Sequence, residues 1–418
     1  MNATGNRSFH TMCKPHGSIC NLDCSYCFYL SREALLGSES GFRMADRVLE
    51  EYVRQYIGGV DTREVIFSWQ GGEPSLMGLD FFTRVVELQK KYAKPGQTIL
   101  NDLQSNCTLL DDKWCEFLKE NNFLVGLSID GPRDLHDRYR KDKGGGKTFD
   151  RVMASVKLLR KHGVEFNTLT CLNRANAREP LRVYKFLRDE VKSERIQFIP
   201  IVEPNIFKTV APGLWDKKGL PKLGSKEAKP GKDGSYVHDW SVDPDDFGDF
   251  MCAVFDEWYR KDFGKVFVYF FETAIAQWMG GMASLCVFAP SCGRGVMLEH
   301  DGKVYSCDHY GYPEYMLGSI METPLDQLVA CHRQTEFGND KHMRLPRYCR
   351  DCQYVFACNG ECPKNRFLLA PDGAPGLNYL CSGLKKYFAH IDSYIDEIIR
   401  RLDAKSQEAG NQKFQLGL

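Results

Sequence analysis

The chain has 418 residues, of which 43% are hydrophobic and 26% charged, a composition that predicts a globular protein with two or three domains. Its 55 basic and 55 acidic residues balance, so no overall field attracts nucleic acid or an anionic membrane. The N-terminus lacks the apolar core of a signal peptide, and no run approaches the roughly 18 apolar residues of a membrane span. We therefore expect a cytoplasmic protein with no nucleic-acid or membrane partner.

Short runs of β-branched residues alternate with stretches of helical periodicity, which is typical of β/α units around a parallel sheet. The pattern predicts strands over residues 9–14, 64–69, 98–104, 124–129, 164–171 and 196–202 and helices over 45–57, 80–91, 111–120, 148–162 and 178–191. A stretch rich in Pro, Gly and Lys over 204–243 is expected to be a long connection or insertion. Beyond it we expect helices over 245–260, 272–280 and 384–402 and a strand over 265–270.

Polar and glycine-rich segments follow most of the predicted strands. Catalytic residues of parallel α/β barrels gather at the carboxyl ends of the strands. We therefore expect these segments to meet at one mouth of the barrel: residues 70–74, 104–106, 128–132 and 202–204.

The loop after the first strand carries Cys20, Cys24 and Cys27 in a C-x3-C-x2-C pattern. The chain contains 17 cysteines, and in a reducing compartment such a number indicates metal ligation rather than disulfides. Three thiolates leave one iron of a cubane cluster without a protein ligand, so that this iron is free to react. The alternatives are a zinc knuckle completed by His16 or three cysteines that merely share a loop.

The turn after the second strand reads Gly71-Gly72-Glu73-Pro74. Glycines allow the backbone to approach a ligand closely, and Glu73 offers a carboxylate to a cationic group such as an amine. The alternative is a tight strand-to-helix turn with a solvated glutamate.

A second group of eight cysteines lies near the C-terminus: Cys286, Cys292, Cys307, Cys349, Cys352, Cys358, Cys362 and Cys381. Eight thiolates are the number that two cubane clusters need for full ligation. The alternative is a pair of structural zinc sites, which share the C-x2-C spacing.

The three-cysteine loop and the Gly-Gly-Glu turn on the next strand resemble the radical S-adenosylmethionine (SAM) superfamily, and the later cysteines resemble its SPASM auxiliary-cluster domain. The resemblance implies an α/β fold with a partial (β/α)6 barrel, followed by a cysteine-rich domain with two auxiliary iron–sulfur clusters. It also implies three 4Fe-4S clusters and SAM as cofactors. The SAM contacts that it implies are Tyr26, Gly72, Glu73, Ser128, Arg140 and Val202.

The same resemblance implies an interleaved ligation of the two auxiliary clusters. The first cluster takes Cys286, Cys292, Cys307 and Cys362, and the second takes Cys349, Cys352, Cys358 and Cys381. Both clusters are then fully ligated by cysteine, which suits electron transfer rather than substrate binding.

Within the superfamily the chain is most similar to the anaerobic sulfatase-maturating enzymes, in segments such as 20–30, 69–74, 123–132, 304–309 and 376–381. These enzymes oxidise a Cys or Ser in a C/S-x-P/A-x-R motif of a sulfatase to Cα-formylglycine. The resemblance makes Asp308 the proton acceptor and Tyr29 and Gln70 weaker candidates for orienting the substrate. Its implied partners are an unfolded or nascent sulfatase polypeptide and an electron donor such as flavodoxin or ferredoxin, with a monomeric enzyme.

These inferences divide the chain into a barrel (1–203), an insertion (204–243), a bridging region (244–285), a SPASM domain (286–390) and a C-terminal end (391–418). Two features depart from the family pattern, namely Cys107 in place of glycine after residues 104–106 and a long stretch over 213–235. Other readings stay open: a SPASM enzyme that forms a thioether crosslink or an epimerised residue, and a zinc-binding scaffold protein. The sequence leaves open the identity of the sulfatase, the preference for Cys or Ser, the electron donor, the oligomeric state and the role of residues 213–235.

Overall fold

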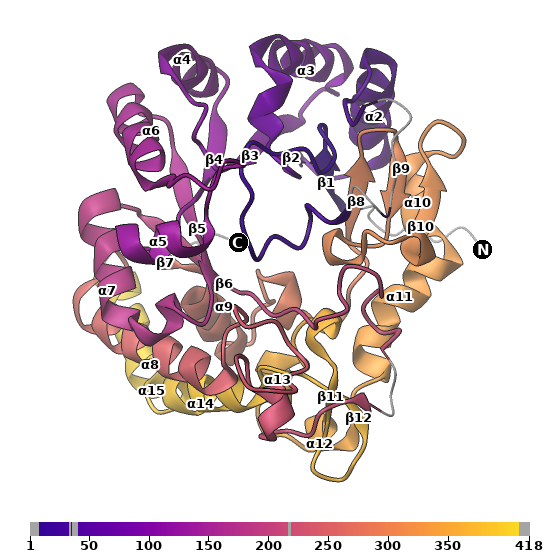
Figure 1. Cartoon of the computed structure of the whole chain (residues 1–418). Coiled ribbons are helices and arrows are strands. Elements are labelled where there is room, and N and C mark those ends of the chain that lie inside the picture. The colour runs from indigo at the N-terminus through magenta and orange to yellow at the C-terminus, as the bar shows by residue number, and fades with distance from the viewer. Residues whose placement is uncertain (1–7, 33–34, 36–40, 216–218, 409–418) are drawn as a thin grey trace.

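The computed structural model describes residues 8–32, 35, 41–215 and 219–408. Seven parallel strands neighbour one another in chain order and curve into an open ring (Figure 1). They are β1 (His10–Lys14), β2 (Glu64–Trp69), β3 (Thr98–Ser105), β4 (Phe123–Ser128), β5 (Phe166–Leu172), β6 (Arg195–Pro200) and β7 (Phe267–Val268). The six β/α units predicted from periodicity are thus present, and each strand begins and ends within two residues of its prediction.

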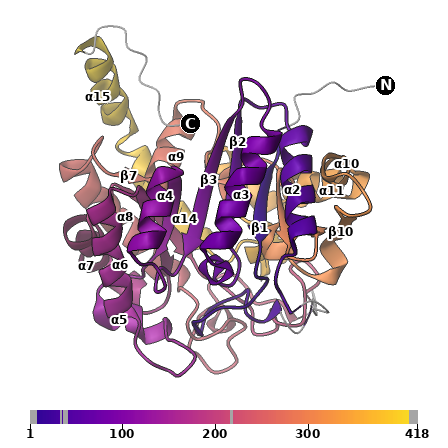
Figure 2. The same cartoon turned by 90° about the horizontal axis from the view of Figure 1, so that it is seen from above.

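Helices cover the outer face of this sheet, as Figure 2 shows for α2, α3 and α4 against β1, β2 and β3. Local signals set several helix ends. The Asp111 side chain accepts a hydrogen bond from the backbone of Trp114 at 2.9 Å and so caps α4, while Gly163 adopts a left-handed φ of 64° and ends α6. The helices that follow β1 to β5 are α2 (Asp46–Gly59), α3 (Leu79–Tyr92), α4 (Asp112–Glu120), α5 (Arg133–Tyr139), α6 (Phe149–His162) and α7 (Pro180–Lys185).

Three strands from the second half of the chain extend the same sheet beyond β1. β8 (Gly295–Glu299) pairs in parallel with β1, and β9 (Lys303–Tyr305) and β10 (Met316–Ser319) follow as an antiparallel pair. The sequence did not reveal these strands, because they are short and lie among cysteines and glycines that suggested loops. The sheet therefore runs across the expected start of the cysteine-rich domain, and the domain limits remain a prediction.

Several predicted elements differ in extent. The helix expected over 178–191 begins at Pro180, and its last turns widen into a π-helix over Phe186–Val191. The strand expected over 265–270 is only β7, and α9 (Tyr269–Trp278) starts immediately after it. The helix expected over 384–402 is two helices, α14 (Cys381–Asp392) and α15 (Ile395–Glu408). The short helix α5 was not predicted because two turns carry little periodicity.

The remaining helices carry the cysteine-rich region and close the ring. They are α8 (Pro244–Lys261), α10 (Leu325–Ala330), α11 (His332–Met343), α12 (Arg347–Arg350) and α13 (Val355–Cys358), with a small hairpin of β11 (Leu368–Leu369) and β12 (Pro375–Leu377). α14 packs closely on α8 because Gly383 and Gly248 face each other. A Cβ atom on Gly383 would lie 2.1 Å from the carbonyl oxygen of Pro244. None of the described helices is long and apolar enough to cross a membrane.

The segment between β6 and α8 docks on the cysteine-rich region, although most of its residues lie outside helices and strands. Leu223 donates a backbone hydrogen bond to Leu369 at 3.2 Å, and Leu369 donates one to Pro221 at 2.9 Å. The Tyr315 hydroxyl donates to the carbonyl of Pro212 at 2.8 Å. The insertion therefore packs on the cysteine-rich region, beside the ring of strands (Figure 1).

Candidate active site and cluster-binding cysteines

The three-cysteine loop leaves the carboxyl end of β1 and crosses the centre of the ring (Figure 1). It is held by backbone hydrogen bonds from Asp23 to Lys141 at 2.8 Å and from Ser25 to Tyr139 at 3.1 Å. Burial raises the pKa of the Cys20 thiol to about 12, with the Glu73 carboxylate adding to the shift. A thiol in such a place becomes a thiolate only when a strong positive charge, such as iron, compensates it.

The Gly72-Glu73 turn lies directly against this loop. A Cβ atom on Gly72 would lie 2.0 Å from the carbonyl oxygen of Ile19, so only glycine fits there. The Gly72 and Glu73 amides donate to the carbonyls of Gly17 at 2.9 Å and Ile19 at 2.8 Å. The tight turn thus fastens the second strand's end to the cysteine loop.

Glu73 is 1% exposed, and its carboxylate accepts hydrogen bonds from four neutral donors. These are Ser75 N at 3.1 Å, Ser75 Oγ at 2.6 Å, Ser105 Oγ at 2.7 Å and Asn106 N at 2.8 Å. Burial raises the pKa of Glu73, and these hydrogen bonds oppose the shift. No ion pair of Glu73 occurs among the described residues, and a buried carboxylate of this kind suits a cationic ligand group.

Tyr26, Asp130 and Arg140 form a buried cluster behind the loop. The Tyr26 hydroxyl donates to Asp130, and Arg140 Nε lies 3.0 Å from Asp130 Oδ2. Asp130 Oδ1 also accepts the backbone amide of Cys171 at 3.1 Å. The sequence singled out Tyr26 and Arg140 but not Asp130, although the polar segment after β4 contained it. The structure thus brings all three together and pairs the Arg140 charge with an internal carboxylate.

The other residues expected to contact SAM or substrate lie at strand ends of the ring. Ser128 ends β4 and is buried, and Gln70 follows β2 and donates its amide to Cys13 at 2.9 Å. Val202 is fully buried, and its carbonyl accepts from Lys364 Nζ at 2.6 Å. Lys364 also pairs with Glu203 at 2.6 Å. This lysine, which the sequence did not single out, fastens the end of the last barrel strand to the cysteine-rich region.

Asp308 and Tyr29 are joined through Lys14, the last residue of β1. Lys14 is 2% exposed, its ammonium forms an ion pair with Asp308, and it lies 4.6 Å from the centre of the Tyr29 ring. The Tyr29 hydroxyl in turn donates to Glu299, which is next to Lys14 in the β1–β8 register. Lys14 and Glu299 were not foreseen, because the β8 strand that brings them together was not predicted.

The surroundings of Asp308 favour its ionised form. Burial pushes the pKa of the Asp308 carboxyl upward, but the positive charges of Lys14 and Arg32 outweigh it, so the pKa lies below its ordinary value. Burial lowers the pKa of His309 to about 4, with Lys364 contributing. Asp308 is therefore a carboxylate near pH 7, able to accept a proton, beside a neutral imidazole.

Arg32 is a further buried cation near this cluster. It is 2% exposed and stacks on the ring of Tyr312 at 3.6 Å, but its Nε and Nη1 atoms have no hydrogen-bond partner among the residues that the structure describes. Buried guanidinium groups normally satisfy their donors. These two nitrogen atoms suit acceptor oxygens of a bound molecule.

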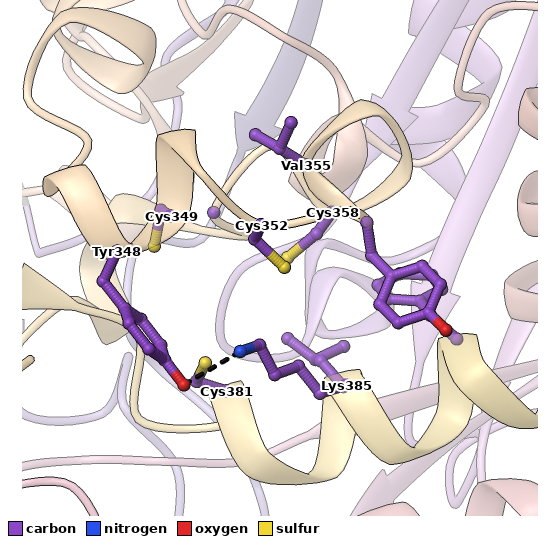
Figure 3. Close-up of a pocket in the computed structure, with 11 residues that line it drawn as sticks. Tyr348, Cys349, Cys352, Val355, Cys358, Cys381 and Lys385 are labelled. Atoms are coloured by element: carbon purple, nitrogen blue, oxygen red, sulfur yellow. Dashed lines mark hydrogen bonds between the residues drawn. The ribbon is translucent and has the colours of Figure 1, made fainter. Parts of the chain in front are cut away.

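Four of the later cysteines line one pocket between α12, α13 and α14 (Figure 3). They are Cys349, Cys352, Cys358 and Cys381, drawn from three separate segments. Apolar and aromatic side chains complete the lining, and the Lys385 ammonium at its edge donates to the Tyr348 hydroxyl at 2.8 Å. The arrangement supports the second of the two proposed ligand sets.

The other four cysteines influence one another electrostatically. Burial raises the pKa of the Cys307 thiol, and Cys362, Cys286 and Cys292 add to the shift. Within the described residues, no three His, Cys, Asp or Glu side chains are arranged to hold a single metal ion. A cubane cluster takes one thiolate at each iron and therefore needs ligands spread around a larger body. The proximity of these four thiols supports the first proposed ligand set.

Comparisons with known proteins agree with this geometry. The family model of the radical SAM superfamily matches residues 15–187, and that of an iron–sulfur cluster-binding domain, SPASM, matches residues 286–353. The chain is 44% identical over 396 residues to the serine-type anaerobic sulfatase-maturating enzyme of Bacteroides thetaiotaomicron, a match that covers 95% of this chain and 92% of that protein. The chain belongs to this family of maturases.

Other maturases are similar over nearly the same length. The cysteine-type anaerobic sulfatase-maturating enzyme of Clostridium perfringens is 33% identical over 90% of this chain and 94% of that protein. The solved structure of native anSMEcpe with bound AdoMet and the Kp18Cys peptide superposes with a TM-score of 0.80 at 31% identity, covering 94% of this chain and 99% of that chain. The predicted family and fold are thereby confirmed.

As a maturase, this protein binds SAM and a 4Fe-4S cluster in its radical SAM domain and auxiliary iron–sulfur clusters in its SPASM domain. Its residues fit these cofactors. The buried Glu73 carboxylate, which has no cationic partner among the described residues, suits the SAM amino group, and Gly72 allows the turn that carries Glu73 to pack directly on the loop of cluster cysteines. The SPASM match ends at residue 353, so Cys358, Cys362 and Cys381 lie beyond it.

Proposed function

We propose that this protein oxidises a Cys or Ser side chain of a sulfatase polypeptide to Cα-formylglycine. The observation that carries the proposal is the ionised, partly exposed Asp308 carboxylate, which pairs with the buried Lys14. The relatives that span the chain are named serine-type or cysteine-type maturases, and anSMEcpe binds peptides in its solved structures. A peptide substrate placed at Asp308 is consistent with both.

The cofactor contacts follow from the residues around the loop. When bound, the cluster and SAM supply a 5′-deoxyadenosyl radical, which abstracts a hydrogen atom from the substrate. As the family likeness implies, Glu73 and Gly72 would bind the amino group of SAM, Tyr26 and Val202 the adenine, and Ser128 and Arg140 the ribose and carboxylate. Cys20, Cys24 and Cys27 hold the cluster that this chemistry needs.

Asp308 accepts the proton of the substrate thiol or hydroxyl. Lys14 favours the ionised carboxylate and fixes its place, because the buried ammonium lies against a carboxylate that is only 16% exposed. Tyr29, held by Glu299, and Gln70 at the end of β2 orient the substrate side chain.

The eight later cysteines would hold two auxiliary clusters in the interleaved pattern, so that the protein carries three 4Fe-4S clusters. The auxiliary clusters would accept the one electron that remains after the substrate has lost a hydrogen atom and a proton. We propose flavodoxin or ferredoxin as the electron donor and a monomer as the active form. The barrel, insertion and SPASM limits given above are part of the same proposal.

The experiment that tests the activity uses anaerobically reconstituted enzyme with SAM, a reductant and paired peptides that carry Cys or Ser in a C/S-x-P/A-x-R motif. Formylglycine formation lowers the peptide mass by about 18 Da from Cys and about 2 Da from Ser, and the aldehyde forms a hydrazone. The protein is expected to be brown, with about twelve irons per chain. Cleavage of SAM with no aldehyde in either peptide would contradict the proposal, and the ratio of the two rates measures the preference.

A further inference from the structure

A second cavity lies between the insertion and the cysteine-rich region, outside the residues assigned above. Its volume is about 310 Å³, which is at the lower end for ligand-binding pockets. We call it the aromatic pocket and define it by Trp215, Leu220, Tyr310, Tyr315, Phe337 and Arg344. Three separate parts of the chain contribute these residues.

The aromatic wall of the pocket is rigid. Phe337 packs edge-on against Tyr310 at 4.9 Å and Tyr315 at 5.9 Å between ring centres, and the two tyrosines pack against each other at 4.7 Å. The Tyr315 hydroxyl is fixed on the carbonyl of Pro212. Rings held in this way offer flat apolar surfaces whose ordering costs no further entropy on binding.

The polar groups of the pocket are engaged within the protein. Arg344 pairs with Asp340 at 2.7 Å. Lys341 donates to the carbonyls of Cys286 at 2.9 Å and Val287 at 2.8 Å, and Arg366 donates to that of Gly360 at 2.9 Å. Lys341 and Arg366 keep their positive charges, but most of the exposed lining of the pocket is apolar and therefore suits apolar side chains.

The pocket shares a short element of the chain with the candidate base. Tyr310 belongs to the same short 3₁₀ helix as Asp308 (Asp308–Tyr310), and Tyr315 follows a few residues later. Between them in the sequence, the Tyr312 ring stacks on the Arg32 guanidinium, whose Nε and Nη1 atoms have no partner in the described part of the chain. A polypeptide that presents one residue to Asp308 must continue on either side, and it supplies both backbone carbonyls for Arg32 and side chains for the pocket.

We propose that the aromatic pocket binds an apolar segment of the substrate polypeptide that flanks the residue to be oxidised. This inference rests on the proposed function and extends it, because it gives the enzyme a contact outside the short target motif. The bound segment is a stretch of unfolded chain, since a folded domain could not enter a pocket of this size.

The test compares two peptides on the unmodified enzyme. One covers only the target motif, and the other adds about ten residues on each side, a reach of roughly 33 Å when extended. We expect the long peptide to have a KM at least about fivefold lower with the same kcat. Replacing the apolar flanking residues with serine should remove that advantage.

Two variants on α11 locate the effect. Phe337→Ala removes the central ring of the wall, and Met343→Ala removes an exposed apolar side chain, 71% accessible, outside the pocket. Phe337→Ala should raise the KM of the long peptide about fivefold or more and leave that of the short peptide unchanged, whereas Met343→Ala should change neither. Fluorescence anisotropy of a labelled long peptide with Ala at the target position measures binding without turnover.

Equal KM values for the long, short and serine-flanked peptides would overturn the inference even if Phe337→Ala did not fold. If Phe337→Ala raised the KM of the long and the short peptide equally, the inference would also be overturned, because the ring would then affect binding of the target motif itself. The absence of aldehyde from every peptide would instead refute the proposed function, so the two failures are distinguishable.

Discussion

Replacing Asp308 with asparagine tests the base with almost no change of shape. The side chain keeps its volume and can still accept a hydrogen bond from Lys14, but it loses the negative charge and the ability to take a proton. If Asp308 is the proton acceptor, the variant should still cleave SAM while failing to form the aldehyde.

The expected size of the effect follows from the role and from the buried pair. A positioned general base contributes roughly 10²- to 10⁴-fold to a rate, so the barrier to peptide oxidation should rise by about 3–5 kcal/mol. Removing one partner of a buried ion pair also costs about 3–5 kcal/mol of stability, and Lys14 is only 2% exposed. The loss of stability must be measured separately, since an unfolded variant would also fail to form the aldehyde.

The assay follows both products in the same reaction. Chromatography quantifies 5′-deoxyadenosine and mass spectrometry quantifies the modified peptide, while iron content and thermal unfolding report on folding. Asp301→Asn serves as the control, because it makes the same chemical change in the β8–β9 turn, where Asp301 pairs with Lys303 at 2.7 Å near the surface. The control should oxidise peptide at the unmodified rate.

Aldehyde formation within about threefold of the unmodified rate would remove Asp308 from the mechanism, because no base would then be missing. Loss of both 5′-deoxyadenosine and aldehyde, with normal iron content, would instead show that Asp308 supports SAM binding. Only normal cleavage of SAM without formation of the aldehyde agrees with a role of Asp308 as proton acceptor.

Three further predictions concern the cofactor sites and one buried acid. Gly72→Ala should abolish SAM cleavage, because the added Cβ atom would lie 2.0 Å from the carbonyl oxygen of Ile19. The control Gly58→Ala should cleave SAM normally, because its Cβ atom would have no neighbour within 4 Å. Normal production of 5′-deoxyadenosine by Gly72→Ala would contradict the requirement for glycine in this turn. Cys358→Ala should lower iron from about twelve to about eight per chain, and a full complement would exclude Cys358 as a ligand. Burial raises the pKa of Glu272 to about 7, so its neutral form is favoured in the folded state. Stability contributed by that neutral form is lost as pH rises from about 4.5 to about 7. At pH 8 the free energy of unfolding of Glu272→Gln, measured by denaturant titration, should therefore exceed that of the unmodified protein by up to about 3 kcal/mol, and the difference should shrink toward pH 5. An equal difference at pH 8 and pH 5 would contradict the raised pKa of Glu272.

The sequence predicted the parts of the fold that depend on local signals. The strands β1 to β6 and the helices α2 to α6 other than α5 follow from periodicity of about two or 3.6 residues, with caps such as Asp111 and Gly163 at helix ends. These signals do not depend on distant parts of the chain, because they arise from backbone geometry and from one buried face. Spacing also sufficed to recognise the three-cysteine loop and its likeness to radical SAM enzymes.

Contacts between distant segments could not be predicted in this way. Asp308 was placed at the site by family likeness, but its pairing with Lys14 depends on β8 lying beside β1, and β8 to β10 are too short to show a period. Asp130 and Arg32 were overlooked for a similar reason, since their importance comes from what surrounds them in space.

The amino-acid sequence by itself therefore determined the barrel, the cysteine motifs and the family, because each is written in residues close together along the chain. Only the tertiary structure decided which charges meet in the buried site and where the insertion forms the aromatic pocket. Those features depend on burial and on long-range packing, and the electrostatic strength of a pair such as Lys14 and Asp308 is set by how completely the fold excludes water around it.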